Sequence, residues 1–186
     1  MLDISQYNFS DWLKFTFAHP LTTPEWYFSE DWEYQGNHSK MIEYSTKLFN
    51  APELLVEDYF FEQINQGLWF IPRTYGYILY LLDEDIPWKI RKECIDSFYN
   101  LFLYLFSKYK ISGGADIMWW DSIFSYGVYE DPVRGIKTFG ESPEILKCFY
   151  DVIVQIKKID GENIRECVKL GLDNIYTYKD IYPHIF

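Results

Sequence analysis

Carboxylates are the residues whose number and spacing best suit chemistry in this chain. Of its 28 Asp and Glu residues, two groups stand out: Glu57, Asp58 and Glu62 at helical spacing, and Asp83, Glu84 and Asp85 in a turn. Two acids in one cleft, with environments that push their pKa values apart, can act as the acid and base of a hydrolase. Charge runs are more often solvated faces, so the sequence favours a surface role for both groups.

Histidines give no sign of a metal site. His19, His38 and His184 are far apart and form none of the His-Glu-x-x-His, Glu-x-x-His or His-x-His patterns that bind zinc or paired iron. The sequence also lacks the Gly-x-Ser-x-Gly elbow of hydrolases, a phosphate-binding loop and a dinucleotide fingerprint. We therefore expect no metal, no cofactor and no catalytic residue, and favour a protein that is not an enzyme.

The cysteines indicate the cellular compartment. Cys94, Cys148 and Cys167 have no metal-ligand spacing and lie among apolar neighbours, which predicts buried, reduced and unreactive thiols. Reduced thiols are typical of the cytoplasm. Residues 1–10 show no signal peptide, and the most apolar window, from Phe98 to Phe106, is far shorter than the roughly 20 residues of a membrane span. We expect a cytoplasmic protein that does not bind membranes.

Aromatic content and acidity together describe the surface. The chain of 186 residues contains 15 Phe, 17 Tyr and 7 Trp and has a formal net charge of −11. Each aromatic side chain can bury about 150–250 Å², and the polar tips of Tyr and Trp favour a surface or a groove for part of this set. Nucleic acids would be repelled by the acidic surface, whereas a basic protein partner would be attracted.

The most distinctive aromatic segment is Met118-Trp119-Trp120-Asp121. Adjacent residues on a helix lie about 100° apart, so we expect one indole in the core and the other against a second element or solvent. One interpretation is that both are packing anchors. The other is a binding patch that includes the acidic turn, with these candidate residues: Trp120, Asp121, Tyr126, Tyr129, Asp83, Glu84 and Asp85.

Hydrophobic periodicity predicts an all-α fold with about seven helices in a single domain, residues 1–186. The helices are expected near residues 10–17, 39–50, 52–68, 72–82, 87–109, 143–156 and 164–175. Residues 1–38 are otherwise expected to form an irregular, aromatic-rich strap packed on this domain. The segment Ile90–Ile95 is echoed by Ile164–Val168, which is either chance or the trace of a helix-pair repeat.

Three motifs carry a resemblance to known proteins: Gln66 to Ile71, Pro87-Trp88-x-x-Arg91-x-x-Cys94, and Met118 to Asp121. They resemble a family of uncharacterised bacterial proteins with a HEAT-like helical fold, over about residues 60–175. Small, acidic, aromatic-rich proteins of this sort also resemble the immunity proteins of bacterial toxin systems. The resemblance implies antiparallel helix pairs and transfers no catalytic residue.

The sequence thus predicts an acidic protein-interaction module, most specifically an immunity-type inhibitor that binds a basic bacterial toxin. The alternative is an enzyme or a small-molecule-binding protein that uses an aromatic and carboxylate cleft. A deep pocket holding two carboxylates, or a convergent Tyr–Asp pair, would favour the alternative. The oligomeric state is left open.

Overall fold

The computed structural model describes residues 2–29, 32–33, 36–72, 77–111, 113–126 and 138–186. Nine α-helices lie within these residues: α1 (Phe9–Phe17), α2 (Trp26–Ser29), α3 (His38–Asn50), α4 (Leu54–Asp58), α5 (Phe61–Phe70), α6 (Trp88–Leu101), α7 (Trp119–Tyr126), α8 (Pro143–Ile156) and α9 (Glu162–Tyr176). Shorter helical turns are the 3-10 segments η1 (Tyr77–Leu82), η3 (Phe139–Glu141) and η4 (Pro183–Ile185) and the π segment η2 (Phe102–Phe106). The prediction of an all-α fold is confirmed for the described residues, apart from a two-residue parallel pairing of β1 (Leu2–Asp3) with β2 (Trp32–Glu33).

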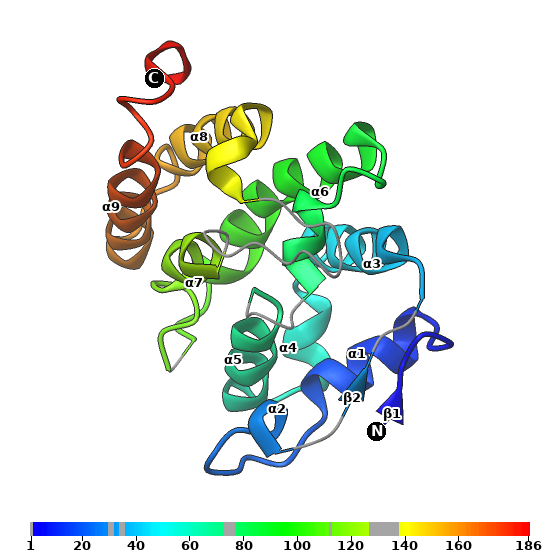
Figure 1. Ribbon diagram of the computed structural model, residues 1–186. Helices are drawn as coiled ribbons and strands as arrows, with labels where there is room; N and C mark the ends of the chain where they lie inside the picture. Colours follow the sequence, from blue (N-terminus) through cyan, green and yellow to red (C-terminus); the bar gives the residue numbers. More distant parts are fainter. Residues whose placement is uncertain (1, 30–31, 34–35, 73–76, 112, 127–137) are drawn as a thin grey trace.

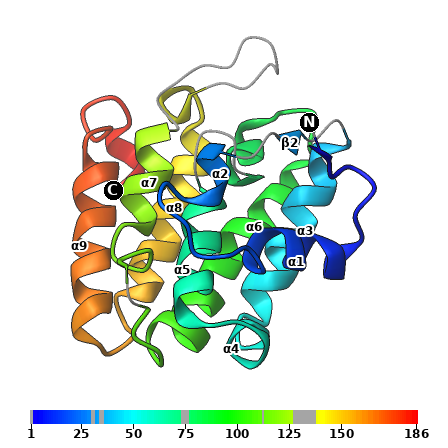
Figure 2. The same ribbon diagram turned by 90° about the horizontal axis from the view of Figure 1, so that it is seen from below.

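The larger helices pack side by side, as Figures 1 and 2 show. Helix α3 packs on α6, α6 on α8, and α8 on α9, while α7 packs on α9. Helix α1 lies against α5 on another side of the molecule. Among the described residues, none of the helices has both the length and the apolar character needed to cross a bilayer.

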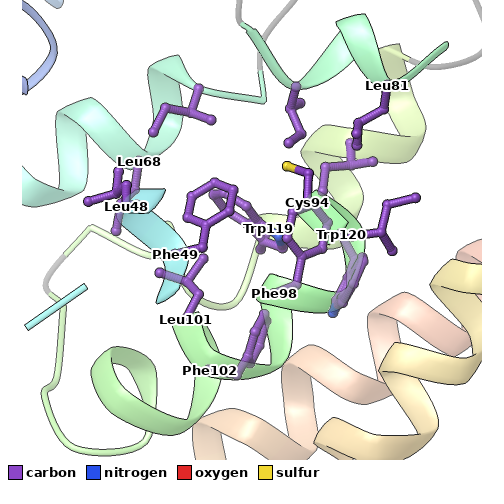
Figure 3. Packing of buried hydrophobic residues seen from close by; sticks show 14 of the residues in the cluster. Leu48, Phe49, Leu68, Leu81, Cys94, Phe98, Leu101, Phe102, Trp119 and Trp120 are labelled. Carbon is purple, nitrogen blue, oxygen red and sulfur yellow. The ribbon is translucent and has the colours of Figure 1, made fainter. Parts of the chain in front are cut away.

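Helix α6 is the centre of the core. Phe98 and Phe102 are fully buried. The ring of Phe98 meets the indole of Trp119 edge to face, with centroids 5.7 Å apart, and the same indole meets Phe49 of α3. Figure 3 shows these rings together between α3, α6 and α7. Three elements far apart in the sequence therefore share one aromatic core.

The long helix predicted for residues 87–109 forms as far as Phe106, but its second half is not α-helical. After Leu101 the chain forms the π segment η2, in which the amide of Ser107 donates to the carbonyl oxygen of Phe102 over 2.9 Å. Phe102, Leu105 and Phe106 are all buried, and the wider turn lets the rings of Phe102 and Phe106 meet edge to face at 4.9 Å. Backbone hydrogen bonds of this wider spacing take the place of the ordinary α-helical ones at this end of the helix.

The helix predicted for residues 52–68 is also interrupted. Tyr59 and Phe60 have extended backbone, so that α4 ends at Asp58 and α5 begins at Phe61. The amide of Phe60 donates to Oε1 of Gln63 over 3.2 Å, which caps the start of α5. The break turns the direction of the chain and leaves a corner between the two helices.

The first 38 residues contain more structure than predicted. Helix α1 forms where a short helix was expected, but its N-cap is Asn8 rather than Ser10, since the amide of Asp11 donates to Oδ1 of Asn8 over 3.0 Å. Helix α2 and the two short strands also lie in the segment expected to be irregular. For residues 72–82, the described part is the 3-10 segment η1 rather than an α-helix.

Candidate functional site

Trp119 and Trp120 are both core residues. The indole of Trp120 is 0 % exposed, lies near parallel to Phe102 with centroids 5.9 Å apart, and covers Gly171 of α9. The interpretation of this pair as packing anchors therefore fits the structure. Trp120 presents no surface to a partner in this conformation.

The remaining residues of the predicted aromatic patch do not assemble into a described site. Asp121 is half-buried in the first turn of α7. Tyr126 is the last residue of α7, and its side chain lies outside the described part of the structure, as does the whole of Tyr129.

The acidic turn divides into one structural and two surface residues. Asp83 is buried; its Oδ2 lies 2.6 Å from Nδ1 of His38, and its Oδ1 accepts a hydrogen bond from the amide of Asp85. The imidazole of His38 stacks on Tyr80 with centroids 3.9 Å apart. Asp83 therefore ties the start of α3 to the segment before α6, while the side chains of Glu84 and Asp85 are exposed.

The corner between α4 and α5 exposes two aromatic rings within the segment predicted as one helix, residues 52–68. We call Glu57, Asp58, Phe60, Phe61 and Glu62 the aromatic corner. Phe60 is 77 % exposed, the highest value among the large hydrophobic side chains of the described residues, and Phe61 is 37 % exposed. The single helix predicted for residues 52–68 does not form here, because the break at Tyr59 separates α4 from α5.

Tyr59 fixes the chain beneath the corner. It is half-buried, and its ring lies 5.7 Å from that of Phe17 in α1. Burial, with a smaller contribution from the neighbouring Asp58, raises the pKa of the Tyr59 phenol. Because Tyr59 points toward α1, the next ring along the extended backbone, Phe60, is left in solvent.

Carboxylates surround these exposed rings. Glu57, Asp58 and Glu62 are exposed, as is Glu53 at the start of α4. None of the four forms an ion pair with another described residue, and residues 48–72 contain no Lys or Arg. The sequence signal that finds this site is a run of three aromatics, Tyr59 to Phe61, with acids on both sides.

A separate cavity of about 680 Å³ lies beside the corner, between the segment after η2 and the first turn of α9. Its lining includes Tyr109, whose ring lies 5.9 Å from that of Phe61. Three carboxylates also line it, those of Asp116, Glu162 and Glu166. The cavity thus contains the aromatic and carboxylate side chains expected of the alternative function, an enzyme or a small-molecule-binding protein.

Cysteine chemistry and metal chemistry find no support in the described residues. All three cysteines are free and buried, which confirms their prediction as buried thiols. Burial raises the pKa of the Cys94 thiol to about 12, so its reactive thiolate is suppressed at neutral pH. Within the described part of the chain, no three His, Cys, Asp or Glu side chains are grouped so as to hold a metal ion.

No protein family, curated protein or solved structure was found to match the chain. The resemblance to HEAT-like and immunity proteins therefore stays a prediction, and the functional argument rests on the residues of this chain.

Proposed function

We propose that the protein functions by binding a basic protein partner, and that the aromatic corner is the contact surface. The observation that carries the proposal is the exposure of Phe60 among acids that have no ion-pair partner in the described residues. Burying one such ring contributes about 1.5–3 kcal/mol, and aromatic anchors commonly dominate interface energetics. The acids select the partner by charge.

The acids and the rings have separate roles in this proposal. Glu53, Glu57, Asp58 and Glu62 attract a basic surface over a distance and speed the encounter. Phe60 and Phe61 bury apolar surface after contact and slow dissociation. An immunity-type inhibitor of a basic bacterial toxin is the most specific form of such a protein, and the cytoplasm is where we place it.

The proposal retains a HEAT-like scaffold. Helices α8 and α9 are consecutive in the described chain and pack on each other, which supports their interpretation as one helix pair.

The test begins by identifying the partner at the corner itself. A photo-crosslinking phenylalanine analogue is placed at position 60 in the native host, and the cross-linked protein is identified by mass spectrometry. The matched control carries the analogue at Ile181, which is 62 % exposed near the C-terminus. We expect one protein with excess Lys and Arg to be captured from position 60 and not from position 181.

Binding kinetics of the purified pair then test the role of charge. The triple variant Glu57→Gln, Asp58→Asn, Glu62→Gln should bind more slowly, with an on-rate that depends less on salt. The control removes the same charge elsewhere, through Glu93→Gln, Glu144→Gln and Asp160→Asn, and should retain most of the on-rate. An acidic partner, or an equal loss in both triple variants, would overturn the proposal.

A further inference from the structure

The cavity beside the aromatic corner has the size of a small-molecule site. Its volume of about 680 Å³ lies within the 300–1,000 Å³ typical of ligand pockets. Its apolar lining includes Phe106, Tyr109, Ile111 and Ile117, and its polar lining includes Lys108, Lys110, Asp116, Glu162, Asn163 and Glu166. The walls come from the segment after η2, the loop before α7 and the start of α9.

Asp116 is the unusual residue of this lining. The residue is only 5 % exposed, and its Oδ2 accepts a hydrogen bond from Nδ2 of Asn163 over 3.2 Å. Its other oxygen, Oδ1, accepts no hydrogen bond from the described residues. A carboxylate can accept about four hydrogen bonds. Oδ1 is not among the buried side-chain atoms that lack a partner, so it is open to a donor that enters the cavity.

Asp116 is oriented by Asn163. The side-chain Nδ2 of Asn163 donates both to Oδ2 of Asp116 and to the carbonyl oxygen of Phe106, the latter over 2.8 Å. Phe106 is the last residue of the π segment, and π turns within helices are frequent at functional sites. The unusual helix end thus supplies the acceptor that orients Asn163 toward Asp116.

The loop that carries Asp116 is anchored on α5. The amide of Ala115 donates to Oδ1 of Asn65, and the indole of Trp69 donates to the carbonyl oxygen of Gly113. Gly113 and Gly114 have φ angles of +109° and +80°, which only glycine adopts readily. The buried carboxylate therefore lies on a fixed frame rather than on a free loop.

The charges of the cavity favour a cation. Its carboxylates, Asp116, Glu162 and Glu166, outnumber its two lysines, and Nζ of Lys108 lies 5.0 Å from the centroid of the Tyr104 ring. The buried thiol of Cys167 donates to the backbone carbonyl oxygen of Asp116 over 2.9 Å, and its pKa is raised by burial and then by the Asp116 charge. Three carboxylates against two lysines give the lining a net negative charge, which disfavours an anion.

We propose that this cavity binds a small organic cation with a primary ammonium group and an apolar chain. The ammonium donates to Oδ1 of Asp116, with Glu166 at the α9 wall adding attraction. The chain packs against Tyr109 and Ile117. The two sites adjoin, since the ring of Tyr109 contacts that of Phe61 in the aromatic corner, but the ligand proposal rests on Asp116 and not on the protein partner.

The test uses n-pentylamine as the probe, with the full chain labelled for amide NMR. A ligand with six heavy atoms should bind with a dissociation constant on the order of 1 mM. We expect amide shifts at Gly113 to Asp116 and at Asn163. Pentyltrimethylammonium has the charge without the N–H donors and should bind at least about tenfold more weakly, a factor typical of one lost charged hydrogen bond. Pentanoate should cause no shifts there.

Variants connect the binding to the carboxylate. Asp116→Asn should weaken pentylamine binding about tenfold or more, whereas Asp160→Asn, an exposed acid just before α9, should leave it unchanged. Glu166→Gln changes an exposed side chain and should weaken binding severalfold, which keeps the test decisive if Asp116→Asn does not fold. Absence of cavity shifts with pentylamine, equal binding of both ammonium probes, or equal affinity in the two Asp variants would overturn the proposal. Each of these results leaves the cross-linking at position 60 unaffected.

Discussion

Trp120 and Phe60 are aromatic residues beside acids, and they have opposite exposures, 0 % and 77 %. The difference comes from neighbours distant in the sequence. Trp120 is covered by α9 at Gly171, where the missing Cβ leaves room for the indole. Phe60 lies in an extended link between two helices, and neither helix covers it. Local sequence around the two residues does not distinguish these outcomes.

Phe102 gives the most direct test of the core. It is fully buried and contacts both Phe106 and Trp120. Phe102→Ala should lower the free energy of unfolding by about 3–5 kcal/mol, since it removes a buried ring and leaves a cavity. Chemical denaturation measures this change, and a loss under about 1 kcal/mol would be too small for a core position.

Cys94 predicts a dependence of stability on alkaline pH. Burial raises its pKa to about 12, with an opposing contribution from a hydrogen bond to Thr46. In the unfolded chain a thiol ionises near pH 8.5. The protonated thiol therefore favours the folded state fully below about pH 8.5, and this contribution is lost as pH rises toward the folded-state pKa.

The comparison of the native chain with Cys94→Ala isolates this contribution. The difference in unfolding free energy between them should shrink above about pH 9, by up to about 1.4 kcal/mol per pH unit. Urea denaturation at several pH values measures it. A difference that stays constant from neutral pH to about pH 11 would show that the thiol is already ionised in the fold, or exposed.

At the scale of elements, two helix pairs approach closely at glycine. A Cβ on Gly67 of α5 would lie 2.2 Å from the Phe17 ring of α1 and 2.9 Å from the carbonyl oxygen of Thr16. A Cβ on Gly171 of α9 would lie 2.9 Å from the Trp120 indole of α7. These contacts set the distances between the helices that support the aromatic corner and the core.

Alanine at either position should therefore destabilise the fold, although alanine favours a free helix by about 1 kcal/mol. We expect Gly67→Ala and Gly171→Ala to cost about 1–3 kcal/mol through overpacking. Gly140→Ala is the control, because its Cβ would meet ordinary contacts at 3.4 Å and beyond. Thermal unfolding of the three variants measures this loss of stability. Equal midpoint temperatures for Gly67→Ala and Gly140→Ala would contradict this account.

An element could be predicted from the sequence where neighbouring residues determine it, and not where it depends on contacts distant in the sequence. Helices α3, α8 and α9 were predicted because their apolar residues recur at helical spacing and Pro143 starts α8. The π segment was not predicted from the sequence, because it depends on burying Phe102, Leu105 and Phe106 together. The corner at Tyr59 was not predicted either, because the apolar residues of α4 and α5 keep one helical spacing across the break. The cavity depends on Asp116 and α9 meeting across a long stretch of chain.

At the scale of the whole molecule, the acidity is unevenly distributed. Residues 48–72 contain four acidic residues and no Lys or Arg, so the aromatic corner carries negative charge without compensation. Like charges repel one another in the folded state, and salt screens that repulsion. The net charge of −11 therefore opposes compact folding at low ionic strength.

Stability should accordingly rise with moderate salt. Between about 0.01 M and 0.1 M NaCl the Debye length falls from about 30 Å to about 10 Å, and the unfolding free energy should increase. The triple variant Glu57→Gln, Asp58→Asn, Glu62→Gln should show a smaller increase than the native chain. Urea denaturation at the two ionic strengths measures both, and a native stability that falls with salt would contradict a self-repelling surface.

The dissociation rate from the basic partner tests the central claim most directly. Phe60→Ser removes the exposed ring of the aromatic corner, and Ile181→Ser removes an exposed apolar side chain of comparable accessibility elsewhere. Surface-bound kinetics with the partner cross-linked at position 60 should show dissociation at least about tenfold faster for Phe60→Ser, as expected for an interface anchor, and unchanged for Ile181→Ser. Equal dissociation rates for the native chain and Phe60→Ser would contradict the assignment of the aromatic corner as the binding surface.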